Sequence, residues 1–236
     1  MAITPYPMLF GATLWEKLTA INGFNVVASN WAYFIEGGLV TLQLTVLSVS
    51  AGMVLGLIIA LMKMSRWRLL SSVAVIYIDF FRGTPLLVQV MLFHFGILPI
   101  FIDSGPFLSG VIACSLNSAA YVAEIVRAGI QAVDRGQMEA ARSLGMNGSQ
   151  AMRYVILPQA YKIVVPPMIN EFVMLLKDTS LVSVIAVMEL THRGKLLYST
   201  TYEAAWVWGA VCVVYYIMTK TIAMMGDWIE RRLATE

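Results

Sequence analysis

The sequence has little charge. Only 13% of its 236 residues are Asp, Glu, Lys or Arg, about half of the roughly 25% that is typical of soluble domains, whereas 59% are hydrophobic. The 16 basic and 14 acidic residues leave a formal net charge of +2, which is too small to indicate a nucleic-acid partner. The composition predicts a membrane protein, so the placement of the basic residues is more informative than their sum.

Cysteine and histidine are equally scarce, with two residues of each. Cys114 and Cys212 lie in apolar segments, where a thiol packs as a small hydrophobic group, so we expect neither a disulfide nor a metal site. His94 and His192 are about a hundred residues apart and belong to no metal-spaced cluster. We therefore expect no catalytic and no metal-binding residues in this chain.

A phosphate-binding loop of the form G-x-x-x-x-G-K-[ST] is also missing from the sequence. The nearest approach is Arg193-Gly-Lys-Leu196, which has neither the hydroxyl residue nor the preceding glycine. If the chain takes part in an ATP-driven process, we expect another polypeptide to bind the ATP.

The N-terminal segment lacks the basic start and the small-residue cleavage site of a secretory signal, because residues 1–36 carry only Glu16, Lys17 and Glu36 as charges. We expect this segment to be retained outside the membrane domain, with an interfacial helix around 8–18. The membrane domain is expected at 37–226, followed by a cytoplasmic tail at 227–236.

Five apolar stretches have the length of a membrane-spanning helix, since about 20 helical residues cross a hydrocarbon core about 30 Å thick. These predicted spans are 39–62, 86–102, 107–129, 167–188 and 204–225. The run 69–78 is too short to cross and is interpreted as an interfacial helix. The predicted fold class is therefore all-α, a polytopic membrane protein with five transmembrane helices.

The first predicted span contains Gly52-Met-Val-Leu-Gly56, a small-xxx-small pattern that lets helix backbones approach closely. We expect a helix-packing face there. Five helices enclose little cavity on their own, which favours an assembly of two such units.

Basic residues orient the spans, because Lys and Arg accumulate in short cytoplasmic loops. One side is expected to hold Lys63, Arg66, Arg68, Arg82, Arg127, Arg135, Arg142, Arg153, Lys162, Lys220, Arg231 and Arg232. The other side is expected to hold Lys17, Arg193 and Lys195. The N-terminus is therefore predicted outside and the C-terminus inside, with the polar segment 131–166 in the cytoplasm.

This polar segment contains the run EAARSLGMNGSQAMRYVILP at residues 139–158. Asp134 and Asn147 are each followed three residues later by Gln, which is capping-box spacing at a helix start. Gly145 suits a helix end, because glycine adopts the left-handed conformation at low cost. We therefore expect two short helices that meet at a glycine elbow.

The same region contains three prolines. Pro158 is expected to stop the second short helix, and Pro166-Pro167 to break the chain again before the fourth span, because proline lacks the backbone amide. Capped helices are common in loops, so a solvated connector is an equally good interpretation of these signals alone.

The spacing in the run resembles the cytoplasmic signature of membrane subunits of ATP-binding-cassette (ABC) importers: Glu-Ala-Ala, three residues, Gly, nine residues, an aliphatic residue, any residue, Leu-Pro. The matching positions are Glu139, Ala140, Ala141, Gly145, Val155, Leu157 and Pro158, with Val155 where Ile is usual.

Further stretches between residue 37 and about residue 226 resemble the polar amino-acid uptake subfamily, the histidine, glutamine and arginine permeases. They are GGLVTLQLTVLSV from Gly37, FFRGTPLLVQ from Phe80, LNSAAYVAEIVRAGIQAV from Leu116, ILPQA from Ile156 and NEFVMLLKDTSLVSVI from Asn170.

The resemblance implies a type I ABC importer permease fold in the bacterial inner membrane, with a coupling helix at the elbow that docks on an ATPase subunit. The implied docking residues are Glu139, Ala140, Ala141, Gly145, Leu157 and Pro158. The implied partners are ABC ATPase subunits, which bind ATP and Mg, a second permease copy or a homologous permease, and an external solute-binding protein. The amino-acid substrate and membrane lipid are the other expected contacts, and no cofactor is expected in this chain.

Polar residues inside the spans are candidates for solute contact, because an ionisable group there costs roughly 2.5 to 3.5 kcal/mol on insertion scales. Spacing of i, i+4 and i+7 places three side chains of the third predicted span on one face: Asn117, Tyr121 and Glu124. The fourth predicted span has four such residues on or beside one stripe: Asn170, Glu171, Lys177 and Asp178.

The alternative for these stripes is hydrogen bonding between packed helices. Glu124 has a cationic neighbour in Arg127, and Lys177 and Asp178 can satisfy each other or close a gate. Both interpretations stay open on sequence alone.

We interpret the chain as a permease subunit that imports polar amino acids and couples to ATPases through 139–158. Glu171 weakly favours a cationic solute. One alternative is an ion-coupled secondary transporter that uses the carboxylates of Glu124, Glu171 and Asp178. Another is a scaffold subunit whose polar faces only pack.

Overall fold

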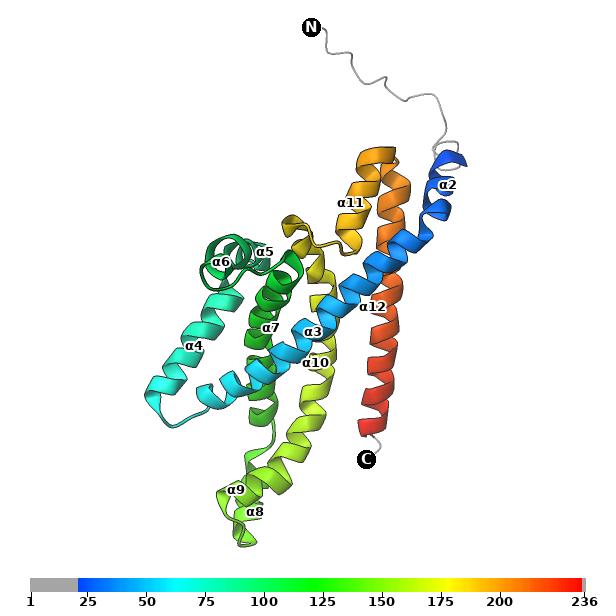
Figure 1. The fold of residues 1–236 in the computed structure, drawn as a ribbon. Helices are drawn as coiled ribbons and strands as arrows, with labels where there is room; N and C mark the ends of the chain where they lie inside the picture. The colour runs from blue at the N-terminus through cyan, green and yellow to red at the C-terminus, as the bar shows by residue number, and fades with distance from the viewer. Residues whose placement is uncertain (1–20, 235–236) are drawn as a thin grey trace.

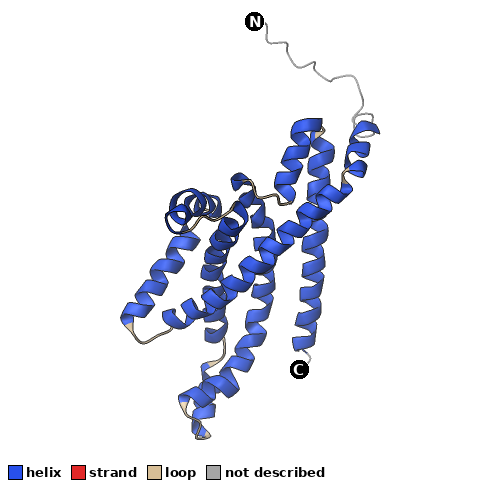
Figure 2. Cartoon of the chain, in the orientation of Figure 1, coloured by secondary structure: helices blue, strands red, loops and turns tan. Residues whose placement is uncertain are grey.

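The computed structural model describes residues 21–234, and every element within that range is helical (Figure 2). The elements are α2 (Ile21–Ser29), α3 (Trp31–Lys63), α4 (Arg68–Gly83), α5 (Leu86–Met91), η1 (Leu92–Ile97), α6 (Leu98–Phe101), α7 (Pro106–Gln131), α8 (Arg135–Ser143), α9 (Gly148–Ala151), η2 (Met152–Ile156), α10 (Leu157–Asp178), η3 (Thr179–Ile185), α11 (Leu190–Thr201) and α12 (Ala204–Ala234). The all-α prediction is confirmed, and the helix expected at 8–18 lies outside the described residues.

Three helices of the described chain, α3, α7 and α12, are each long and apolar enough to cross a membrane. The pair formed by α4 and the helical stretch from α5 to α6 adds a fourth candidate crossing, bent by 106°. α10 runs beside α7 and α12 (Figure 1) and completes a bundle with α3, α4, α7 and α12. The elbow helices α8 and α9 lie at one end of this bundle and α2 at the other (Figure 1).

The second crossing differs from the sequence prediction. Residues 69–78 were expected to form an interfacial helix and 86–102 to form the second span, but α4 packs along the edge of the bundle against α3 and α7. The 106° bend after α4 turns α5, η1 and α6 away from the axis of α4 (Figure 1). Residues 86–102 were predicted to form a span by themselves, whereas the stretch Leu86–Phe101 is the second part of a bent pair that counts as one candidate crossing.

The bend has a local cause at Thr84 and Pro85. Thr84 is extended (φ −121°, ψ 148°), as the residue before a proline prefers, and Pro85 offers no amide to the last carbonyls of α4. α4 nevertheless belongs to the bundle, because Ala74, Ile78 and Phe81 bury one face of it against α3 and α7. Asp79 and Arg82, elsewhere on α4, interrupt its apolar run. A search for charge-free stretches therefore does not identify α4 as part of a candidate crossing.

Arg82 therefore does not lie beside the basic cluster of Lys63, Arg66 and Arg68. It lies 14 residues from Arg68 along α4, or about 21 Å at the rise of an α-helix. Arg82 was grouped with the cytoplasmic residues on the expectation that 69–78 is an interfacial helix, and the length of α4 separates Arg82 from that cluster.

The helix at the predicted span 167–188 also begins earlier than expected. α10 starts at Leu157, ten residues before the predicted start, and contains both Pro166 and Pro167. Pro158 lies in its first turn and does not stop the chain, since the helical path from α9 through η2, α10 and η3 is continuous from Gly148 to Ile185. The second helix of the elbow is thus the start of a long one.

A π-helical segment explains how Pro158 is accommodated. A proline ring in a helix clashes with the carbonyl four residues earlier, and for Pro158 that carbonyl belongs to Tyr154, inside the wider η2. The same arrangement recurs at Pro99, whose corresponding carbonyl belongs to Phe95 inside η1. At both places the wider π-helix accommodates the proline ring that follows it.

The expected packing face of α3 is confirmed. A Cβ at Gly52 would lie 3.0 Å from the side chain of Ser118, and one at Gly56 would lie 2.6 Å from Val122. α3 crosses α7 and packs closely against it (Figure 1), and the two glycines let the backbones approach.

Candidate functional site

The elbow at the end of the bundle is built by two capped helix starts. The Asp134 carboxylate accepts a hydrogen bond from the Gly136 amide at 2.7 Å, so it caps α8 without the box to Gln137 that its spacing allowed. Asn147 and Gln150 form the full capping box at the start of α9, with both distances at 2.9 Å. The predicted helix starts are confirmed.

Gly145 forms the turn between them. Its φ of +88° is left-handed, and its amide donates to the Arg142 carbonyl at 3.0 Å while the Met146 amide donates to the Ala141 carbonyl at 3.2 Å. This pair of bonds is a Schellman motif, which satisfies the last carbonyls of a helix. A side chain at Gly145 would meet no atom within 4 Å, so conformation alone requires glycine.

A small core beneath the elbow fixes it to the bundle. Val133, Ile156 and Ala160 are buried together, with Met138 of α8 and Val155 of η2 packed against them. The elbow is therefore held by packing from α7, α8 and α10, which distinguishes it from a loosely solvated connector.

The six predicted docking residues divide between surface and interior. Glu139, Ala140, Gly145, Leu157 and Pro158 are exposed, and Ala141 is buried with 3% of its surface accessible. Ala141 faces inward because it lies on the side of α8 that packs toward α9 and η2. Its small side chain permits close packing within the elbow and cannot offer a contact surface.

Two residues at the tip were missed by the sequence reasoning. Leu144 is 82% exposed and Tyr154 is 64% exposed, and both line a shallow hollow of about 320 Å³ with Gly145, Met146 and Gln150. The available signal was a large apolar residue directly before the helix-ending glycine, since an apolar side chain at that turn has no core to enter.

Within the bundle, Asn117 is buried and holds the bend between α4 and α5. Its side-chain amide donates to the Phe81 carbonyl at 3.2 Å and to the Gln89 side-chain oxygen at 2.9 Å. Gln89 in turn donates to the Phe81 and Thr84 carbonyls at 2.9 and 3.0 Å. These two side chains satisfy the Phe81 carbonyl, which Pro85 leaves without its helical donor, and Gln89 also satisfies the Thr84 carbonyl.

Tyr121, one turn along α7, lies under Arg82. The guanidinium carbon of Arg82 is 5.3 Å from the centre of the Tyr121 ring, which is cation–π distance. Arg82 is exposed and Tyr121, near the middle of α7, is half-buried.

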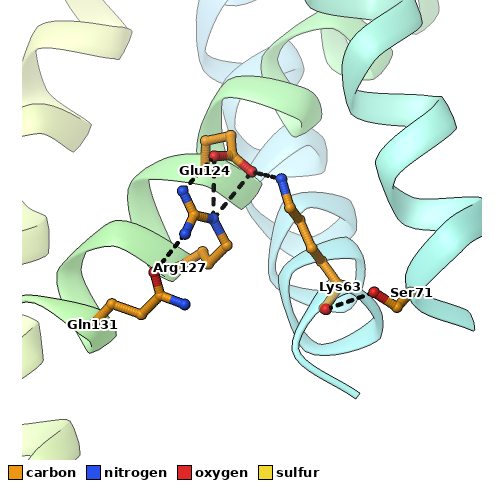
Figure 3. A network of polar contacts seen from close by, with 5 residues as sticks. All are labelled: Lys63, Ser71, Glu124, Arg127 and Gln131. Carbon is orange, nitrogen blue, oxygen red and sulfur yellow. Dashed lines mark hydrogen bonds and ion pairs between the residues drawn. The ribbon is translucent and has the colours of Figure 1, made fainter. Parts of the chain in front are cut away.

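Glu124 binds two cations (Figure 3). It forms ion pairs with Lys63 at the end of α3 and with Arg127 one turn along α7, whose guanidinium lies 2.8 Å from the carboxylate. The Ser71 hydroxyl donates to the Lys63 carbonyl at 3.0 Å, which adds α4 to the same network. The expected pairing with Arg127 is present, and Lys63 is a partner that the sequence reasoning did not name.

Of the four stripe residues on α10, one forms a hydrogen bond to another helix within residues 21–234. Glu171 is 7% exposed and accepts a hydrogen bond from the Ser118 hydroxyl of α7 at 2.9 Å. Asn170 and Lys177 are exposed, and Asp178 is half-buried without an ion pair to Lys177 among residues 21–234.

The two predicted stripes therefore do not face each other. Asn117, Tyr121 and Glu124 share one face of α7 as expected, but that face packs against α3, α4 and α5. Glu171 reaches α7 on a neighbouring face, at Ser118. The polar groups form two separate regions of the bundle.

A family model for the binding-protein-dependent transport system inner membrane component matches residues 52–235. The chain belongs to this family. Its members are membrane components of ABC transporters, and the family does not favour the ion-coupled alternative.

Curated relatives of this transport component cover nearly the same length. It is 35% identical to the probable glutamine ABC transporter permease protein GlnM of Bacillus subtilis, covering 89% of this chain and 97% of that one. It is 37% identical to the arginine transport system permease protein ArtQ of the same species, covering 89% and 96%. It is 37% identical to the glutamine transport system permease protein GlnP of Escherichia coli, covering 84% and 92%.

Solved structures agree with the fold of this transport component. A crystal structure of an amino acid ABC transporter with histidines is 46% identical, with a TM-score of 0.84 over 87% of this chain and 96% of that one. The MetNI methionine ABC transporter in an inward-facing form is 21% identical, with a TM-score of 0.72 over 86% and 97%, and it supports the fold alone. The type I ABC importer permease fold is thereby confirmed.

Proposed function

We propose that this permease subunit imports polar amino acids, with cationic ones favoured, in an ABC transporter of the inner membrane. The observation that carries the proposal is the 46% identity, over 87% of the chain, to a transporter described as an amino acid ABC transporter with histidines. The relatives named for glutamine and arginine support the same substrate class.

The proposed coupling site is the tip of the elbow. Leu144, Tyr154 and Ala140 are exposed there beside Glu139, and the capped, packed construction below them provides a rigid surface for an ATPase subunit. An exposed Tyr is typical of residues that anchor a protein interface, and the exposed Leu144 beside it adds apolar surface. Leu157 and Pro158 border this surface, and Ala141 supports it from within.

The proposed solute path includes the region where Arg82 lies over Tyr121. A guanidinium matches the α-carboxylate of an amino acid, since it offers planar, paired donors. Glu171 and Asp178 offer acceptors for an ammonium or guanidinium group, while Asn170 and Lys177 lie exposed on the same helix. In this proposal Asn117 and Glu124 hold neighbouring helices together and do not contact the solute.

We further propose the arrangement around the subunit. Residues 37–226 form the membrane domain, with the N-terminus outside and both the elbow (131–166) and the tail (227–236) in the cytoplasm. Two ATPase subunits bind ATP and Mg, because this chain has no phosphate-binding loop. A second permease copy or a homologous permease completes the path, and an external binding protein delivers the amino acid.

The test is reconstitution of the permease with its ATPase subunits and binding protein in vesicles. Amino acids are then scanned for stimulation of ATP hydrolysis and for uptake, and arginine, lysine, histidine and glutamine are expected to stimulate both. Lack of stimulation by any amino acid would refute the substrate class. Gradient-driven uptake by vesicles that contain only the permease would refute the ATP-driven mechanism.

A further inference from the structure

An apolar groove of about 720 Å³ runs between α10 and α12, closed behind by α3 and α7. Along α10 it extends from Tyr161 to Phe172, which is about 16 Å at the rise of an α-helix. That length is about half of a hydrocarbon core about 30 Å thick, or one leaflet of the membrane. The groove therefore has the depth of a lipid tail from one leaflet.

The chemistry of the walls excludes the amino-acid solute. Val165, Ile169, Ile222 and Met225 are typical of the lining, and Tyr161 at one end is its single polar side chain. A zwitterionic solute would lose its hydration there without gaining hydrogen bonds.

The elbow-side end of the groove is charged. Directly beyond Tyr161 and Ile229, an opening of about 440 Å³ is lined by Lys162 and Arg231, with Glu230 and Pro166. The lining of this opening thus contains two basic residues and one acidic residue. Basic pockets between membrane helices at this level are suited to anionic lipid headgroups.

Aromatic residues place this end at the membrane surface. Tyr161 is 58% exposed and Trp228 is 54% exposed, on the two helices that border the groove. Tyr and Trp gather at the interface between hydrocarbon and water, where a ring is half in each medium. A lipid tail in the groove would therefore have its phosphate at the depth of Lys162 and Arg231.

We propose that this groove is a binding site for an anionic phospholipid of the elbow-side leaflet, with one acyl chain between α10 and α12 and the phosphate beside Lys162 and Arg231. The lipid fills a gap between the helix that continues from the elbow and the last helix of the bundle. The site is independent of the identity of the transported solute.

The experiment uses the whole transporter, permease with ATPase subunits, in membranes of equal phosphatidylglycerol and phosphatidylcholine. After detergent extraction, the lipids that stay bound are counted by native mass spectrometry. The wild type is expected to retain phosphatidylglycerol about fivefold over phosphatidylcholine, the effect of one net cation near a membrane surface. The double variant K162S/R231S is expected to lose this preference.

The matched control is R66S/R68S, which removes the same charge from two exposed residues, one just before α4 and one at its start. This control is expected to keep the preference, and equal loss in both double variants would overturn the proposal. Met225→Trp places a larger side chain at an exposed residue of the groove wall and is expected to reduce retention of both lipids. Unchanged retention in that variant would also overturn it.

A second copy of this chain is the competing occupant. Met225→Cys is made in a Cys212→Ser background, because Cys212 is exposed and Cys114 is buried. Efficient crosslinking between the introduced thiols of two permease copies in the assembled transporter would show that a second permease covers the groove and would refute the lipid site. Labelling of the introduced thiol by a lipid-soluble maleimide, without crosslinking, supports it.

Discussion

The hydroxyl of Tyr215 on α12 donates a hydrogen bond to the buried carboxylate of Glu189 at 3.0 Å. The same carboxylate accepts from the amides of Thr191 and His192, at 2.8 and 2.6 Å, and so caps α11. One carboxylate thereby fixes the start of α11 and ties it to the last helix of the bundle.

Tyr215→Phe removes one donor to this carboxylate and leaves the ring in place. A hydrogen bond to a charged group contributes about 1.5 to 3 kcal/mol, so a clear loss of thermal stability is expected in detergent. Tyr216→Phe, on an exposed neighbour, is the control and should leave the melting temperature unchanged. Equal melting of the two variants would show that the Tyr215 bond carries no stability.

Gly145→Val should uncouple the ATPase without preventing membrane insertion. The φ of +88° is strained for a β-branched residue, at about 1 to 3 kcal/mol, and the strain falls on the elbow alone. Gly209→Val, in open space on α12, is the matched control. Coupled transport at wild-type rates by the Gly145 variant would contradict a docking role for the elbow.

Leu144→Ser should weaken ATPase binding about tenfold while the permease remains stable. The side chain is 82% exposed, so its loss leaves no cavity and should change stability by no more than about 0.5 kcal/mol. Pull-down of ATPase subunits measures the binding, and Leu69→Ser, at a 78% exposed residue of α4 outside the elbow, is the control. Equal binding by both variants would show that the tip does not contact the partner.

Glu124→Gln should destabilise the fold and leave transport per folded molecule unchanged. The substitution leaves Lys63 and Arg127 without their shared carboxylate (Figure 3). A double-mutant cycle with Lys63→Gln should give a coupling energy of about 0.5 to 3 kcal/mol in unfolding. Loss of uptake in correctly folded Glu124→Gln would instead indicate contact with the solute.

Arg82→Gln should lower amino-acid uptake in vesicles, because it removes the proposed partner of the α-carboxylate. Tyr121→Phe keeps the ring beneath the guanidinium and should transport normally, whereas Tyr121→Leu should transport poorly. Arg66→Gln controls for loss of charge. Normal uptake by folded Arg82→Gln would remove this region from the path.

The elbow could be predicted from the sequence because its signals are local. Caps at Asp134 and Asn147 and the left-handed Gly145 depend on neighbours a few residues away. The burial of Ala141 could not be predicted, since it depends on how α8 packs against η2, which involves residues that are more distant in sequence.

The bundle was predicted less well for two physical reasons. α4 crosses with charged residues on one side, so a search for uninterrupted apolar runs divides the chain at the wrong place. Asn117 was expected in a solute path, but the carbonyls freed by Pro85 compete for its amide, and that competition appears only when α4, α5 and α7 are packed together. Spacing identified the shared face of α7 correctly and could not identify which helix covers it.

The helical path from Gly148 to Ile185 is continuous, so the second part of the elbow and α10 belong to one structural element. Its 38 residues extend for about 57 Å if each contributes the rise of an α-helix. A sideways push at the tip then becomes a tilt of the segment that carries Glu171, and the path ends beneath α11, where the Ser183 carbonyl lies 3.2 Å from the ring of His192. We expect force applied by a partner at one end to be transmitted to the other along this continuous helical path.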